Sequence, residues 1–67
     1  MKRNDRVQIK GQTPPLTGKV ADAYIIPTRN IQDQTLINKY PEGIPMVEVI
    51  LDNGKLRVFV REIVEKI

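Results

Sequence analysis

Short runs of alternating apolar and polar residues follow one another along the whole chain. In the first run, residues 5–10 (DRVQIK), Val7 and Ile9 point to one side and the polar residues to the other. Five Pro and four Gly separate such runs at intervals too close for long helices. The pattern therefore predicts an all-β fold of short strands.

The second run, residues 19–26 (KVADAYII), is rich in strand-forming residues but does not alternate cleanly. Val20 and Ala23 both suit a core, yet they are three positions apart, so we expect a β-bulge near Ala21 or Asp22. Pro27 then ends the strand or marks an edge. The preceding residues 11–18 (GQTPPLTG) are expected to form a loop.

A tight hairpin is predicted around Asn53-Gly54, because this dipeptide favours a two-residue turn. Such a turn places apolar residues opposite one another on one side of the hairpin. The pairs are Leu51 with Leu56, Val49 with Val58 and Val47 with Val60. We therefore expect these side chains in the core, with Lys55, Arg57, Phe59 and Arg61 on the other face.

Residues 28–45 (TRNIQDQTLINKYPEGIP) form a long polar insertion between the second and third predicted strands. One interpretation is a short helix from Ile31 to Lys39, with Asn30 as its N-cap. The other is an irregular loop that closes on a turn at residues 41–43. The final residues 61–67 (REIVEKI) predict one helical turn and a short closing strand, with Ile63, Val64 and Ile67 as its apolar residues.

The chain has 67 residues, which suits one small domain over residues 1–67. It has no Cys, so neither a disulfide nor a thiolate metal site can stabilise the fold. The longest apolar run is the triplet at residues 24–26, far short of a membrane span, and the N-terminal MKRNDR lacks the apolar stretch of a signal peptide. We expect a soluble, cytoplasmic protein.

The order of the predicted elements is that of the Src-homology-type small β-barrels. Residues 4–9 (NDRVQI) resemble the opening of KOW-type domains and of accessory subunits of photosynthetic electron transfer, such as the ferredoxin–thioredoxin reductase variable chain. Residues 17–20 (TGKV) and 44–49 (IPMVEV) resemble their second and third strands. The resemblance implies a five-stranded Src-homology-like barrel carrying the insertion, and a non-catalytic accessory role.

Catalytic chemistry has little support in the composition. The chain has no His, Cys, Ser or Trp, so the commonest general base, nucleophiles and transition-metal ligands are missing. Its eight acidic residues are scattered. We therefore expect no enzyme activity, no catalytic residue, no metal and no cofactor.

Protein docking is the first functional hypothesis, because the insertion carries apolar and amphipathic residues with little core of their own. The candidate contacts are Arg29, Ile31, Leu36, Ile37 and Tyr40. The alternative interpretation is that the aliphatic members of this set simply cover an open end of the fold. The partner's identity and the oligomeric state stay open.

Nucleic-acid binding is the alternative function. Residues 1–30 carry a net charge of +4 and residues 31–67 a net charge of −1, within a total of +3. In this hypothesis basic side chains contact phosphates and one aromatic ring stacks on a base. The candidates are Lys10, Lys19, Lys55, Arg57, Phe59 and Arg61. Acidic residues on the neighbouring strand of the hairpin weaken this interpretation.

Overall fold

The computed structural model describes residues 1–67 as one five-stranded antiparallel sheet. Its strand order is β4-β3-β2-β1-β5. The strands are β1 (Arg6–Ile9), β2 (Leu16–Ile26), β3 (Ile44–Leu51), β4 (Leu56–Val60) and β5 (Val64–Lys66). The all-β class and the long insertion between the second and third strands are confirmed. No ladder joins β4 to β5, so the sheet stays open and a closed barrel is not confirmed.

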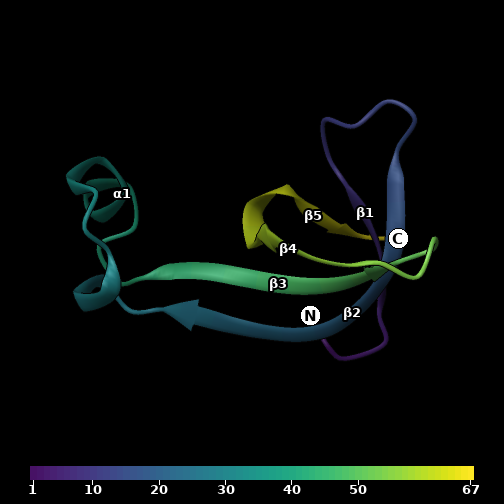
Figure 1. The fold of residues 1–67 in the computed structure, drawn as a ribbon, viewed down its shortest axis with the longest axis horizontal. Helices are drawn as coiled ribbons and strands as arrows, with labels where there is room; N and C mark the ends of the chain where they lie inside the picture. The colour runs from purple at the N-terminus through teal and green to yellow at the C-terminus, as the bar shows by residue number, and fades with distance from the viewer.

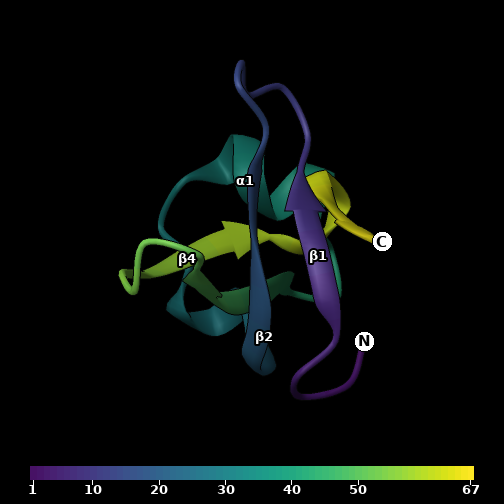
Figure 2. The ribbon, with the colours of Figure 1, turned by 90° about the vertical axis from the view of Figure 1, so that its right-hand side faces the viewer.

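Strand β2 belongs to both halves of the sheet. Its first residues pair with β1, whereas Gly18 to Ile26 pair with β3. The register shifts between Val20 and Asp22, which confirms the predicted bulge. In Figure 1, β2 bends between the two halves, and in Figure 2 β1 and β2 run upright while β4 lies crosswise to them. Beyond the end of β4, the last residues of β2 and the first of β3 continue as a two-stranded ribbon, where Ile25 pairs with Pro45 and Ile26 with Ile44, and this ribbon carries the insertion.

The core lies between the two halves of the bent sheet. Val7, Ile9 and Val20 from β1 and β2 are almost fully buried there, as predicted. The full cluster is Val7, Ile9, Val20, Val47, Val49, Leu51 and Val64. The expectation for Ala23 is wrong: it lies opposite the buried Val47, but it is exposed, because β1 pairs with β2 only as far as Lys19.

Gly18 lies inside β2 and not in a loop, because β2 already begins at Leu16. It is buried opposite Leu51. A Cβ at this position would lie 2.4 Å from the carbonyl oxygen of Ile50. The close approach of β3 therefore requires glycine here, and the loop between β1 and β2 is shorter than predicted.

The insertion contains two short helical segments, η1 (Thr28–Asn30) and α1 (Gln34–Lys39). The helix interpretation is confirmed in part, but the helix begins later than predicted. Its N-cap is Asp33, whose carboxylate accepts a hydrogen bond from the backbone N–H of Thr35 at 2.9 Å. The predicted cap Asn30 instead ends the 3-10 turn. With six residues α1 is marginal alone, and no helix in the structure has the length and apolar character to cross a membrane.

The predicted register of the hairpin is wrong by one residue. Val47 lies opposite Phe59, and Val49 lies opposite Arg57. The loop has three residues: Gly54 donates to the Leu51 carbonyl at 2.8 Å and takes a positive φ of 86°. A turn followed by one left-handed residue adds a position relative to the two-residue turn.

This shift exchanges the two faces of β4, because a one-residue slip turns every side chain to the other side. Val47, Val49 and Leu51 are buried as predicted, but Leu56 and Val58 are exposed on the opposite face of the sheet. The predicted assignment of Leu56, Val58 and Val60 to the core is therefore wrong.

The C-terminal segment forms the predicted helical turn and closing strand. The turn is η2 (Arg61–Ile63), and β5 pairs with β1. Val64 is buried as expected, whereas Ile63 and Ile67 are exposed, so only the first strand residue joins the core.

Candidate functional site

The exposed face of β2, β3 and β4 carries apolar side chains where a solvated surface was expected. Side chains directly opposite one another in antiparallel strands share a face. Ile50 lies opposite Leu56, and Met46 lies opposite both Tyr24 and Val60. We call the resulting set the outer apolar face: Tyr24, Met46, Ile50, Leu56, Val58 and Val60.

The outer apolar face is accessible at its centre. Ile50, Leu56 and Val58 expose 48%, 51% and 44% of their surface. Tyr24, towards the ribbon, exposes 40%. A single exposed apolar residue is ordinary, but neighbouring ones on adjacent strands form a patch, and such patches often mark interaction sites.

Two carboxylates lie within this face. Asp22, just after the bulge, is directly opposite Glu48, and Glu48 is in turn opposite Val58. Neither carboxylate forms an ion pair. Both line an open cleft of about 510 Å³ beside the bulge, together with Arg3. Like charges directly opposite each other disfavour the pairing, so this position favours a cation.

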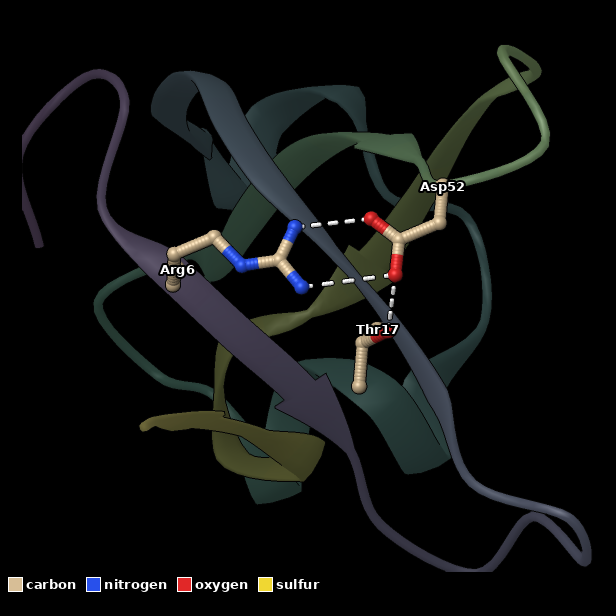
Figure 3. A network of polar contacts seen from close by, with 3 residues as sticks. All are labelled: Arg6, Thr17 and Asp52. Atoms are coloured by element: carbon tan, nitrogen blue, oxygen red, sulfur yellow. Dashed lines mark hydrogen bonds and ion pairs between the residues drawn. The ribbon is translucent and has the colours of Figure 1, made fainter.

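A polar network joins β1, β2 and the turn between β3 and β4 (Figure 3). Arg6 of β1 donates to both oxygens of the Asp52 carboxylate, at 2.7 and 3.3 Å, and Thr17 of β2 donates to the same group. The Asp52 backbone N–H also donates to the Thr17 carbonyl at 3.0 Å. The hydrogen bonds from Arg6 and Thr17 hold the pKa of Asp52 below its ordinary value of 3.8. The network positions the hairpin turn against β1 and β2.

A second cleft, of about 460 Å³, lies beside this network. Its lining includes the basic residues Arg3, Arg6 and Lys19 and the carboxylate of Asp52. Because Asp52 already binds Arg6, the other two cations carry the free positive charge of the cleft. An anionic group is therefore the ligand that this cleft favours.

The insertion is linked to η2 through side chains at the end of α1. The Tyr40 hydroxyl donates to Glu62 at 2.5 Å, and the Lys39 ammonium lies 3.2 Å from the same carboxylate. The hydrogen bond to Glu62 raises the pKa of Tyr40, and the same bond, with that from Lys39, lowers the pKa of Glu62. Tyr40 therefore links the insertion to η2.

The other predicted docking residues of the insertion differ in exposure. Arg29 and Leu36 are exposed, whereas Ile31 and Ile37 are half-buried. The insertion that contains them lies at the end of the ribbon, at the left of Figure 1. The insertion thus offers a second, smaller set of accessible apolar atoms.

The predicted nucleic-acid contacts do not form one surface. Phe59 is opposite the buried Val47 and packs partly buried against the core. Arg61 donates to the Val64 carbonyl at 3.2 Å, and Lys10 pairs with Glu65 at 3.9 Å. Arg57 shares the core-facing side of β4 with Phe59, and Lys55 lies just before β4, where its carbonyl accepts from the Leu51 N–H. Lys19 lies on the outer face of β2 opposite Ile50.

Sequence reasoning missed the outer apolar face because it used the two-residue turn to set the register. The signal that could have found it is the same Asn53-Gly54, since a glycine at the third loop position suits a three-residue loop equally well. With that register, Leu56 and Val58 turn outward, and Ile50 becomes their neighbour.

Comparisons with known proteins give no match. No protein-family model, no curated protein and no solved structure is similar to this chain at a significant level. No group of three or more His, Cys, Asp or Glu side chains is arranged to hold a metal ion. The candidate site is therefore defined by the geometry of the chain itself.

Proposed function

We propose that this protein is a non-catalytic docking module that binds a protein partner through the outer apolar face. The observation that carries the proposal is the exposure of Ile50, Leu56 and Val58 side by side on two paired strands. The resemblance to Src-homology-type accessory subunits belongs to the same proposal. The order of strands and the helical turn before β5 support it.

The charges of the face specify the partner's chemistry. Asp22 and Glu48 lie opposite each other without a basic partner of their own, next to the exposed Val58. A complementary surface has an apolar strip that covers Ile50 and Leu56 and a Lys or Arg that reaches the two carboxylates. Such charge complementarity sets orientation, while the apolar contacts supply most of the affinity.

The insertion has an accessory role in this proposal. Its exposed residues Arg29 and Leu36 lie at the far end of the ribbon, so they extend the contact beyond the outer apolar face. The link between Tyr40 and Glu62 holds the insertion in place for this purpose. Ile31 and Ile37 serve mainly to pack the insertion, because they are half-buried.

The experiment is co-purification with matched variants. Ile50→Ser with Leu56→Ser removes the centre of the face, and Ile25→Ser is the control, because Ile25 is 62% exposed but opposite Pro45 on the other face. A partner that is retained by wild type and Ile25→Ser and lost by the double variant supports the proposal. A partner that persists on the folded double variant and is lost when residues 29–40 are deleted contradicts it.

A second candidate function is binding of nucleic acid through the basic cleft. The supporting observation is the position of Arg3 and Lys19 beside the Arg6–Asp52 pair. Fluorescence anisotropy with a generic single-stranded oligonucleotide tests it at low and high salt. Salt-sensitive binding that weakens in Arg3→Gln with Lys19→Gln favours this function, and absence of binding at low salt excludes it.

A further inference from the structure

The two edges of the sheet differ in how they are protected. The edge strand β5 has only three residues, and two of them are the charged Glu65 and Lys66. Short length and charge are the usual means of preventing edge pairing. The other edge strand, β4, has five residues, LRVFV, of which only Arg57 is charged.

The backbone of β4 has free polar groups along its outer edge. The Leu51 N–H donates to the Lys55 carbonyl at 2.9 Å, so this pair is a hydrogen-bonded one. Bonded and non-bonded pairs alternate in an antiparallel ladder. The backbone groups of Leu56 and Val58 therefore point away from β3. In agreement, the Leu56 carbonyl accepts a bond from the Arg57 side chain at 3.1 Å and not from the sheet.

We propose that β4 pairs antiparallel with β4 of a second copy of this chain, about a two-fold axis at Val58, which joins two sheets into one. The outward-pointing groups belong to Leu56, Val58 and Val60, so a bonded register must pair these residues with one another. An axis at Val58 sets Val58 opposite the partner's Val58 and Leu56 opposite the partner's Val60. The exposed side chains of Leu56 and Val58 then gain apolar neighbours on the partner's strand.

The side chains that face each other within the five residues of β4 favour this register, because Arg57 is the only charged residue there. The like charges Lys55 and Arg61 of the two copies also lie opposite each other in this register, but both lie outside β4. With the axis at Val58, Arg57 lies opposite the partner's Phe59, an arrangement that permits a cation–π contact. Moving the axis to Leu56 would set Arg57 opposite the partner's Lys55, and like charges directly opposite each other are unfavourable. Moving it to Val60 would bring the two η2 turns together and leave Leu56 unpaired.

The pairing has a consequence for the outer apolar face. Two copies joined at β4 place their faces side by side on one continuous sheet, so the dimer presents two docking surfaces to its partner. Ile50 lies on β3, one strand in from the edge, and stays accessible. If the chain does not form this dimer, the proposed docking function is therefore not contradicted.

Cysteine cross-linking tests the axis directly, because the natural chain has no cysteine. Val58→Cys should form a disulfide-linked dimer in the presence of oxidised glutathione. Two residues directly opposite each other in a hydrogen-bonded pair of antiparallel strands have Cα atoms about 5.5 Å apart, a distance that a disulfide can span. Arg57→Cys is the control, because it faces the partner's Phe59 and not its own symmetry mate.

Sedimentation of the natural chain is the second measurement. The expected result is a species of twice the 7.7 kDa chain mass, and a folded monomer for Val58→Lys, checked by circular dichroism. Equal cross-linking of the two cysteine variants would overturn the proposed axis. A natural chain that sediments as a monomer, with no cross-linking of Val58→Cys, would overturn the dimer.

Discussion

Arg6 of β1 and Asp52 of the β3–β4 turn are 46 positions apart, yet the guanidinium binds both carboxylate oxygens. Bidentate geometry of this kind is more specific than an ordinary surface ion pair. We expect Arg6→Gln to lower the melting temperature. Arg57→Gln is the control, because Arg57 has no carboxylate partner. Equal melting temperatures of the two variants would contradict a structural role for the pair.

The same pair predicts a pH dependence. Hydrogen bonds from Arg6 and Thr17 lower the pKa of Asp52 in the folded state. A lowered folded-state pKa contributes stability that is present above the ordinary value of 3.8 and is lost as the pH falls through the folded-state pKa. The difference in stability between wild type and Asp52→Asn should therefore shrink below about pH 4. Urea titrations at neutral and acidic pH measure it, and a constant difference would contradict this assignment.

Gly18 is expected to tolerate no side chain. The Cβ of Gly18→Ala would meet the Ile50 carbonyl oxygen and the Leu51 Cα at 2.4 and 2.9 Å, and both are backbone atoms that cannot rotate away. We expect a loss of about 1–3 kcal/mol in the free energy of unfolding. The control is Gly54→Asn, because that site is open and Asn accepts a positive φ. Equal effects of the two changes would argue against the close strand approach.

The hairpin register predicts unequal effects of two neighbouring truncations. Phe59→Ala should cost about 2 kcal/mol, less than a fully buried phenylalanine, because Phe59 packs on the core while half-buried. Val58→Ala should cost less than about 1 kcal/mol, since its side chain faces outward. Chemical denaturation measures both. The reverse order would restore the register expected from a two-residue turn.

The link between Tyr40 and Glu62 predicts a local effect on dynamics. Tyr40→Phe removes the hydrogen bond to Glu62, so backbone amides of residues 28–43 should exchange faster with solvent. Tyr24→Phe is the matched control, because the Tyr24 hydroxyl forms no hydrogen bond. Hydrogen exchange read by mass spectrometry distinguishes them, and unchanged exchange in Tyr40→Phe would show that other contacts hold the insertion.

Much of the fold could be predicted from local pattern. The alternation at Val7 and Ile9, the broken alternation around Ala21, and the stop at Pro27 each correspond to a feature of the structure. These signals are local, because each depends on residues that are neighbours in sequence. The helical turn before β5 was predictable on the same basis.

The faces of β4 were harder to predict because both contain apolar residues. Leu56, Val58 and Val60 alternate with Arg57 and Phe59, so either set could face the core. Only the loop length decides, and Asn53-Gly54 is compatible with two lengths. The helix start was missed for a related reason: Asn30 and Asp33 are both good caps, and tertiary context selected the second.

The candidate site itself depends on long-range pairing. Asp22 comes to lie opposite Glu48 only because the bulge at Ala21 shifts the register of β2. Likewise, Ile50 and Leu56 become neighbours only through the three-residue loop. The pattern within one strand does not tell which residues of the neighbouring strand lie opposite it. The outer apolar face could therefore be identified only from the structure.

Protection of Ile50 in the partner complex is the decisive measurement for docking on the outer apolar face. The natural chain has no cysteine, so Ile50→Cys and the control Ile25→Cys each place one exposed thiol on opposite faces. Alkylation is timed for each variant alone and in the co-purified complex. We expect at least about tenfold slower alkylation at position 50 in the complex and an unchanged rate at position 25. Equal rates at position 50 with and without the partner would contradict docking on the outer apolar face.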